Sequence, residues 1–488
     1  MTLEQVATAF RESLAGEGEL TLFRIDTLDR TGVPVVQANL IAPGKPATTA
    51  YGYGFSTIQA EVGALGELCE EAHTDRHLQA ITPIHGSYAA LSRQRLVLDP
   101  LSLCLPAGSE YTAGMELAWM EARRWPDGAA ALLPMEWVAA YSYQMAHGPA
   151  RLITPITSGL GAGLDLEHAI GHGIMEALQR DGNVTGFRAL DQGLVVEPDA
   201  VSEDAVRELL EKLGTLGIQV TVKLASTEFG IPNLYVVGRD DGVPAVPIQV
   251  TACGEAAHPD RDRALRKALL EFCGSRARKA AMHGPLELLR HYLPAIYTEA
   301  QFALLDIEEE EPRALQAMAA WLDDDAATLA ARLAGSVFSE TSRQPLSTLP
   351  NTPVAASVPL LDLLTRRLAA EGLEVFYVDC SPPGGTVRVV KVVVPGLEVE
   401  TMSYHRIGWR GVRRLRQRDD PLVIGAPREG ARRVLLRPED EARAGGPAWF
   451  DAGLADRLVG SLYPLYREPG TFSAQRERLR LSGLPVPA

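Results

Sequence analysis

The sequence predicts a mixed α+β fold in which β-sheets pack against amphipathic helices. Strand-like segments are apolar or alternate with a period of two, and they lie at residues 20–28, 33–41, 218–225, 235–238, 246–252, 374–380 and 387–394. Three further segments carry apolar residues at helical spacing, at residues 60–75, 157–183 and 264–276. A chain of 488 residues is long enough for a large core and for two or three structural units.

Composition argues against several classes of protein. The net charge of −15 argues against a general binder of nucleic acid or of anionic membranes. The five cysteines form no Cys-x-x-Cys pair, which fits a reducing compartment and provides no zinc framework. The first residues lack the pattern of a signal peptide, and no apolar run reaches membrane-spanning length. We therefore expect a cytoplasmic protein.

The segment 157–183 combines a glycine-rich stretch with a helix. Gly159, Gly161 and Gly163 permit backbone torsions that side chains forbid, so we expect a turn whose amides line an anion site. A strand at 151–157 would lead into this turn and place a phosphate at the N-terminus of the helix. One stripe of that helix is polar and contains His168, His172, Glu176, Gln179 and Arg180. A polar stripe that only faces solvent is the alternative.

The three helical segments share one spacing. In each, an alanine precedes a glutamate by seven positions, and the pairs are Ala60 and Glu67, Ala169 and Glu176, and Ala264 and Glu271. Residues two helical turns apart share a face, so a small residue that permits close approach lies beside an acid. More polar residues follow one turn later, namely Glu70, Glu71, Gln179, Arg180, Ser275 and Arg276. We expect these helices to direct carboxylates and arginines at one cavity, where an oxygen-rich cluster suits Mg²⁺ with a phosphate.

Taken in order, these stretches resemble the motifs of the YcaO family. The first is Gly-Tyr-Gly-Phe-Ser at 52–56, with Ala-Leu-Gly-Glu at 64–67. The second runs from Ser158 to Asp181 and the third from His258 to Arg276. A later Val-Pro-Gly-Leu-Glu at 394–398 is similar to another family motif, and the resemblance covers residues 20 to 400.

The resemblance implies a fold and a reaction. The fold would pack β-sheets with helices around a central nucleotide cavity. YcaO proteins bind ATP and Mg²⁺ and phosphorylate the oxygen of a peptide backbone amide, which is a matter of positioning and charge neutralisation. A nucleophile then attacks the activated carbon. A Cys, Ser or Thr side chain gives an azoline, sulfide gives a thioamide, and an amine gives an amidine.

The resemblance also implies partners and site residues. We expect a ribosomally made precursor peptide as the substrate, a leader-peptide-binding partner protein, and a homodimer. The implied metal ligands are Glu67, Glu70 and Glu176, and the implied catalytic residues are Glu176, Arg180, Glu271 and Arg276. The implied nucleotide-binding residues are Ser56, Glu67, Glu70, Ser158, His168, His172, Gln179 and Ser275.

Several positions depart from the family motifs. A tyrosine, Tyr53, stands at the motif lysine, and Glu71 stands at an arginine. Leu164 replaces an asparagine, and His168 and Gln179 replace glutamates. Imidazole is a poorer ligand for Mg²⁺ than carboxylate is. A degenerate, non-catalytic member that binds peptide or a partner is therefore an alternative.

We divide the chain into four segments. These are a core with the three motif helices at 1–284, an acidic helical insertion at 285–345, returning core strands at 346–400, and an arginine-rich region with a proline-containing tail at 401–488. The arginines predict either a soluble loop or a dock for an acidic leader peptide. The Pro-x-Pro tail at 484–488 resembles the end of azoline-forming members and favours cyclodehydration. Short helices are expected at 1–15, 115–124 and 202–215.

Overall fold

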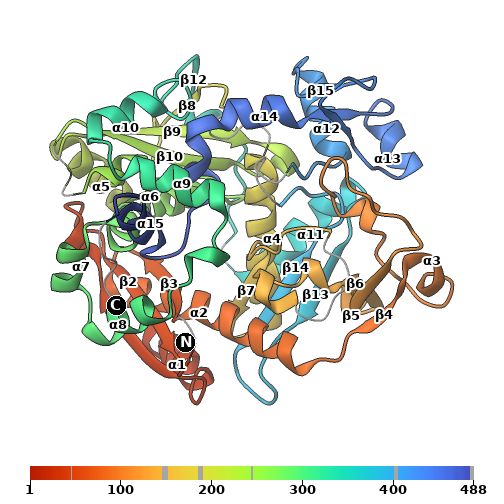
Figure 1. Cartoon of the computed structure of the whole chain (residues 1–488), viewed down its shortest axis with the longest axis horizontal. Coiled ribbons are helices and arrows are strands. Elements are labelled where there is room, and N and C mark those ends of the chain that lie inside the picture. The colour runs from red at the N-terminus through yellow and green to blue at the C-terminus, as the bar shows by residue number, and fades with distance from the viewer. Residues whose placement is uncertain are drawn as a thin grey trace. The chain divides into compact units, whose positions relative to one another are not determined.

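A computed structural model describes residues 1–44, 47–145, 152–184, 191–242, 244, 246–354, 356–399 and 405–483. The chain forms two compact units (Figure 1). Unit 1 comprises Met1–Cys69, Gly186–Pro353 and Val459–Ala488, and unit 2 comprises Glu70–Thr185 and Val354–Leu458. The mixed α+β class predicted from the sequence is confirmed. The four predicted segments follow the chain rather than these units, and they stay a prediction.

Unit 1 begins with a helix and a three-stranded sheet. Helix α1 (Leu3–Ser13) starts with a capping box, in which Thr2 and Gln5 satisfy each other's backbone amides. The antiparallel strands β1 (Glu19–Arg24), β2 (Val35–Ile41) and β3 (Thr48–Tyr53) follow in order. The helix and the first strand pair were both predicted.

A five-stranded sheet of order β11-β10-β9-β8-β12 completes the strands of unit 1. Its strands are β8 (Leu194–Glu197), β9 (Ile218–Ser226), β10 (Asn233–Asp240), β11 (Cys253–Ala257) and β12 (Ser342–Pro345). Helix α5 (Asp204–Thr215) packs on β9 and helix α6 (Arg261–His283) packs on β11. The predicted strand at 246–252 is wrong, because Pro247–Thr251 form a 3₁₀ helix. Within it the Gln249 side chain accepts a hydrogen bond from the Val246 amide, which replaces a strand partner.

Unit 2 is built on a sheet of order β4-β5-β13-β14-β7, with β6 paired to β5. The strands are β4 (Ile84–Ser87), β5 (Glu116–Trp125), β6 (Ala130–Pro134), β7 (Leu160–Gly163), β13 (Val375–Asp379) and β14 (Arg388–Val393). Helix α4 (Leu166–Asn183) covers β7 and β14 and packs against α11 (Ser357–Ala370), while the short α3 (Tyr88–Leu91) follows β4. The returning strands near 374–380 and 387–394 are confirmed as β13 and β14.

The helix predicted at 115–124 is wrong, because these residues form strand β5. Their composition of Glu, Leu, Met, Ala and Arg favours a helix by intrinsic propensity. Pairing with β4, β6 and β13 overrides that preference and buries Leu117, Trp119 and Met120.

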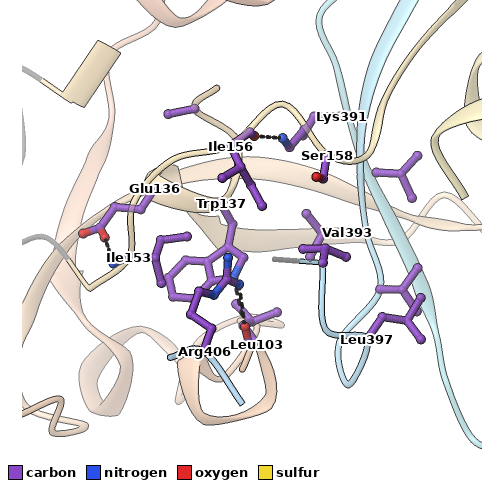
Figure 2. A pocket seen from close by; sticks show the side chains of 14 residues that line it. Leu103, Glu136, Trp137, Ile153, Ile156, Ser158, Lys391, Val393, Leu397 and Arg406 are labelled. Carbon is purple, nitrogen blue, oxygen red and sulfur yellow. Dashed lines mark hydrogen bonds between the residues drawn. The ribbon is translucent and has the colours of Figure 1, made fainter. Parts of the chain in front are cut away.

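A small cavity lies in unit 2 beside β14 (Figure 2). Apolar side chains such as Ile153, Val393 and Leu397 line it together with Ser158 and Lys391. It has room for about one water molecule and is therefore too small for an organic ligand.

The end of unit 2 carries a small sheet and several helices. The sheet has the order β15-β17-β16, with β15 (Val423–Ile424), β16 (Ala431–Arg433) and β17 (Trp449–Asp451), and the helices are α12 (Trp409–Gln417), α13 (Pro438–Arg443) and α14 (Ala452–Val459). The arginine-rich region is only partly a surface patch. Arg406 and Arg410 are buried, and Arg410 and Arg414 form ion pairs with the buried Asp181.

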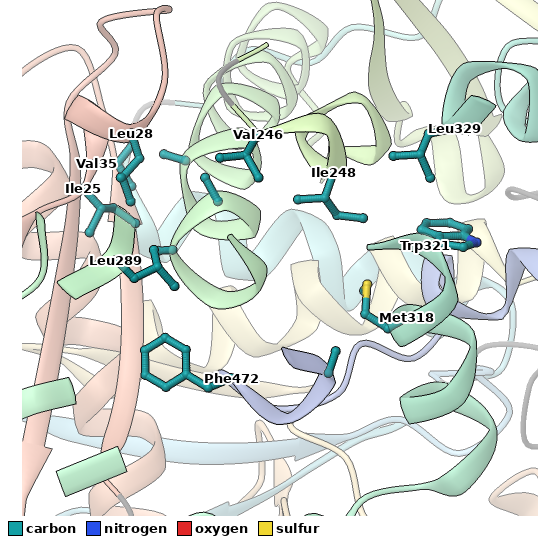
Figure 3. Packing of buried hydrophobic residues seen from close by; sticks show 14 of the residues in the cluster. Ile25, Leu28, Val35, Val246, Ile248, Leu289, Met318, Trp321, Leu329 and Phe472 are labelled. Atoms are coloured by element: carbon teal, nitrogen blue, oxygen red, sulfur yellow. The ribbon is translucent and has the colours of Figure 1, made fainter. Parts of the chain in front are cut away.

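Helices dominate residues 286–333 of unit 1, as predicted for that acidic segment. They are α7 (Leu286–Tyr292), α8 (Ala295–Leu304), α9 (Pro312–Trp321) and α10 (Ala326–Leu333), and α15 (Ser473–Leu481) packs on α9. Their apolar faces share one core with the strands (Figure 3). In it Met318 and Trp321 of α9 lie in the same cluster as Val35 of β2 and Phe472.

At three places in the described part of the chain, a glycine in a strand lies against the backbone of a helix. A side chain at Gly52 of β3 would overlap the Ala60 carbonyl oxygen of helix α2 (Thr57–Ala80), and one at Gly161 of β7 would overlap the Ala169 carbonyl oxygen of α4. Gly254 of β11 lies in the same way against Ala268 of α6. The glycines are thus required for close packing of strand on helix.

This packing corrects the prediction for the glycine-rich segment. A turn forms only at Ser158 and Gly159, where the Leu160 amide donates to the Thr157 carbonyl oxygen at 3.1 Å. Gly159 has a positive φ of +91°, which this turn requires. The following residues, Leu160–Gly163, form strand β7 instead of a turn, and the described residues 152–157 form no strand. Gly161 therefore serves contact with α4 rather than a phosphate-binding turn.

Among the helices in the described ranges, none has the length and apolar character that crossing a bilayer requires.

The glycine contact predicts a measurable cost for a single methyl group. Gly161→Ala places Cβ against backbone atoms of Ala169 and Gly173, which cannot rotate away as a side chain can. We expect the free energy of unfolding to fall by about 1–3 kcal/mol in urea denaturation. Gly171→Ala in the same helix is the matched control, because a Cβ there meets no atom within 4 Å. An equal or larger loss in Gly171→Ala would contradict this account of the packing.

Candidate functional site

The close packing of strand on helix brings glutamates to strand amides. Glu67 of α2 accepts a hydrogen bond from the Tyr51 amide of β3 at 2.8 Å. Glu176 of α4 accepts one from the Gly159 amide at 3.0 Å, just before β7. Each donor is one or two residues before the glycine that permits the close approach. Each amide therefore orients the carboxylate that lies two helical turns beyond the small alanine.

Unit 2 gathers two carboxylates with a histidine and an arginine. Glu70 Oε1 accepts the Ala162 amide at 2.9 Å and lies 3.9 Å from His172 Nε2. Glu176 Oε1 lies 4.0 Å from Arg180 Nη2. The four side chains are 14–38% exposed, so they are held in place but remain open to a ligand.

Lys391 of β14 belongs to the same cluster. Its side chain is 2% exposed, and its Nζ donates to the Ile156 carbonyl oxygen at 2.6 Å (Figure 2). Burial lowers the pKa of Lys391 to about 8, and the negative charges of Glu176 and Glu70 oppose this shift. A buried ammonium group thus lies within the electrostatic influence of both carboxylates. The sequence analysis missed this residue, although a lone lysine within the apolar run 387–394 was a visible signal.

Unit 1 gathers a second set of carboxylates. The Tyr53 hydroxyl donates to Glu271 Oε2 at 3.1 Å. Burial raises the pKa of Tyr53 well above its usual value, and the charges of Glu271 and Glu67 raise it further. Both glutamates therefore lie near this hydroxyl, at the position where the family motif has a lysine.

Arg278 of α6 is the cation of this second set. Burial lowers the pKa of Arg278, but the carboxylates of Glu468, Glu67 and Glu271 outweigh it, so the net pKa is raised. Its Nη2 lies 2.9 Å from Glu468 Oε2. The guanidinium is one-third exposed and was also missed from the sequence. It follows Glu271 by seven positions, as Glu271 follows Ala264, so all three share a helix face.

Arg276, a predicted catalytic residue, lies elsewhere. It is fully buried and pairs with Asp29 at 3.0 Å and with Asp240 at 2.8 Å. It follows Glu271 by five positions, so it is turned away from that face and into the core of unit 1. Its neighbour Ser275 is also buried. Their predicted roles stay predictions, and the contacts of Arg276 are structural.

The remaining predicted residues have varied surroundings. Ser56 Oγ caps α2 by accepting the Gln59 amide at 3.4 Å. His168 is exposed, with Nδ1 3.2 Å from Ser357 Oγ. Ser158 and Gln179 are buried. The Pro-x-Pro tail at 484–488 lies outside the described residues.

The arrangement suits a phosphate-bound Mg²⁺ better than a metal held by protein alone. Within the described part of the chain, no group of three or more His, Cys, Asp or Glu could hold a metal ion. Mg²⁺ commonly takes one or two carboxylates together with substrate phosphates and water. Glu70 and Glu176 in unit 2, and Glu67 and Glu271 in unit 1, supply such carboxylates beside cations. The predicted convergence of all three helices on one cavity stays a prediction.

Comparison with known proteins adds a family and several relatives. Residues 51–398 match the family model of the YcaO cyclodehydratases, which is described as binding ATP and Mg²⁺. An uncharacterized protein of Methanothermobacter thermautotrophicus is 28% identical over 82% of this chain and 95% of its own length.

Two solved structures have a similar fold. A YcaO protein of Methanopyrus kandleri, bound with AMPPCP and Mg²⁺, gives a TM-score of 0.57 at 19% identity and covers 84% of this chain and 94% of its own. A heterocyclase in complex with substrate and cofactor gives a TM-score of 0.59 at 18% identity. That match covers 82% of this chain and 53% of the heterocyclase, so this chain spans about half its length.

The buried lysine predicts a pH dependence of stability. The pKa of Lys391 is about 8 in the folded protein and about 10.5 when unfolded, so between these values the unfolded chain binds the additional proton. Stability should therefore rise with pH through this window. Lys391→Met should remove this rise in the free energy of unfolding, measured by urea denaturation across the window. Lys212→Met, at an exposed lysine, should keep the rise. A Lys391→Met protein that keeps the rise would contradict the prediction.

Proposed function

The chain belongs to the YcaO family, and we propose that it uses ATP and Mg²⁺ to activate a backbone amide of a peptide substrate. ATP and Mg²⁺ are the ligands by which this family is described. The observation that carries the proposal is the cluster of Glu70, Glu176, Arg180 and Lys391 in unit 2, in which two ordered carboxylates lie beside two cations. When bound, Mg–ATP supplies a phosphoryl group to the amide oxygen.

Each of the four clustered side chains in unit 2 has a physical task in this proposal. Glu70 and Glu176 offer oxygen ligands to Mg²⁺, and the amides of Ala162 and Gly159 orient them in advance. Arg180 binds phosphate oxygens and neutralises charge that develops during transfer. Lys391 holds a positive charge in a buried place, where an anion is attracted more strongly than in water.

The acidic and basic side chains gathered in unit 1 have similar tasks in this proposal. The charges of Glu67 and Glu271 raise the pKa of Arg278, and Glu468 forms an ion pair with that guanidinium. Arg278 is proposed as a phosphate-binding residue in place of the buried Arg276, because it is the one that shares a face with Glu271. Asp29 and Asp240 fix Arg276 and through it the second half of α6.

Cyclodehydration is the outcome that we favour. A Cys, Ser or Thr side chain of a ribosomally made precursor would attack the carbon of the phosphorylated amide. The amide oxygen would leave as inorganic phosphate, and the azoline would be lighter than the original peptide by one water. The cyclodehydratase description of the family model and the heterocyclase among the similar folds support this choice. A leader-binding partner protein and a homodimer remain part of the proposal. Thioamide or amidine formation would use the same side chains with sulfide or an amine as the nucleophile.

A non-catalytic role is the second candidate, and one contact favours it. The Tyr53 hydroxyl donates a hydrogen bond to Glu271, and Tyr53 stands at the position where the family motif has a lysine. A tyrosine there offers no positive charge to a phosphate. Calorimetry with Mg–ATP separates the two candidates, since a degenerate site should give no heat of binding.

The catalytic proposal predicts how activity changes when one carboxylate oxygen of Glu176 is replaced by an amide nitrogen. Glu176→Gln keeps the shape of the side chain but removes a charge that Mg²⁺ requires, so precursor-dependent phosphate release should fall at least about a hundredfold. The matched control is Glu167→Gln on the opposite face of α4, which should retain full activity. Mass spectrometry of the precursor should show loss of one water per phosphate released. A gain in mass from sulfur would point to thioamide formation instead. Equal activity of the two variants would contradict the assignment of Glu176.

A further inference from the structure

The sheet of unit 2 has a gap along strand β5. On one side of β5, residues 119–123 pair with β6. On the other side Trp119 pairs with Ile84 of β4, and Arg123 pairs with Tyr377 of β13. Trp119 and Arg123 each pair with β6 as well, so β4 and β13 must lie on the same side of β5. Among the described residues, 120–122 have no strand partner on that side.

Strand β13 opens away from β5 at the same place. Beyond Tyr377, Val378 pairs only with Lys391 of β14, and Asp379 pairs only with Val390. Two strand edges, at 120–122 and 378–379, therefore face one gap that is closed at both ends by paired residues. The gap coincides with a groove of about 680 Å³ that is lined by both edges and by Ile81, Thr82 and Ile84.

The side chains of this groove do not select a charged ligand. Its floor is apolar, since Met120, Ala122 and Val378 are buried. Its rim carries both signs, with Glu121 and Asp379 opposed to Arg123 and Arg388, and all four are exposed. What the groove offers along its length is backbone, and an unpaired strand edge is a template for another extended chain.

We propose that the groove binds an extended segment of the peptide substrate, which adds about three residues as a strand between β5 and β13. This inference rests on the proposed function for the identity of the substrate as a peptide. A second folded copy of the chain would not fit, because the edges are recessed between β4 and β13. Recognition through backbone would accept many sequences and would use apolar side chains of the peptide against the floor.

The paired strands β13 and β14 connect the groove to the candidate site. Val378, on the edge of the gap, is the direct partner of Lys391 on β14. Strands in a sheet lie about 5 Å apart, so a strand in the gap would lie about 10 Å from the strand that carries Lys391. A peptide held there would keep its neighbouring residues within reach of Glu70 and Glu176, which act on the pKa of Lys391.

The test uses the full chain and a defined probe. The probe is the β-prone peptide acetyl-Thr-Val-Thr-Cys-Thr-Val-Thr-amide, and its matched control carries N-methyl groups on the central amides. Hydrogen exchange at millimolar probe should slow severalfold at amides within 120–122 or 378–379. The methylated peptide should leave these amides unchanged. Equal exchange with both peptides, or no slowing with either, would overturn the proposal.

A crosslinking variant provides an independent measurement. Glu121→Cys labelled with a benzophenone should crosslink to the probe, whereas Glu116→Cys on the same strand, where β4 completes the ladder, should not. Equal crosslinking at the two positions would overturn the proposal. ATP turnover is followed with the same peptide. ATP turnover without protection of the gap would overturn peptide binding in the groove and leave the proposed function standing. Protection of the gap without ATP turnover would overturn the proposed function and leave peptide binding in the groove standing.

Discussion

The close contact of a strand with a helix at glycine is the constraint on which the site depends. At Gly52 and Gly161 no side chain separates the strand from the helix backbone. A helix held so close brings its next acidic residue on the same face to a strand amide, as in Glu67 with Tyr51 and Glu176 with Gly159. The packing of strand on helix thus fixes the positions of the carboxylates. A carboxylate that is already fixed loses less conformational entropy when it binds a metal than a mobile one does.

Charge balance explains why these acids can lie together. In unit 2 the carboxylates of Glu70 and Glu176 raise the pKa of Lys391, and in unit 1 those of Glu67 and Glu271 raise the pKa of Arg278. Each cation lowers the repulsion between its acids. The β13–β14 ladder that carries Lys391 also borders the gap in the sheet. The binding of nucleotide and the binding of peptide would therefore depend on the same two strands.

The sequence contained the helices and acids of the site but not the role of its glycines. Alanine and glutamate seven positions apart predicted which residues share a helix face, because helical geometry is local. Gly161 could equally permit a turn or a close contact, and only the position of α4 decides between them. Residues 116–125 have helix-favouring side chains, and strand pairing far along the chain overrode them. Arg278 could have been found by extending the seven-residue spacing one step, whereas Asp29 and Asp240, which bury Arg276, could not.

The central claim is that glutamates positioned by strand packing bind the metal of a metal–nucleotide complex. Electron–nuclear double resonance on the protein with Mn²⁺, a non-hydrolysable ATP analogue and isotopically labelled glutamate carboxylates tests it most directly. The account predicts a coupling between Mn²⁺ and a glutamate carboxylate that is lost in Glu70→Gln or Glu176→Gln. Mn²⁺ that binds with the nucleotide but shows only phosphate and water couplings would contradict it.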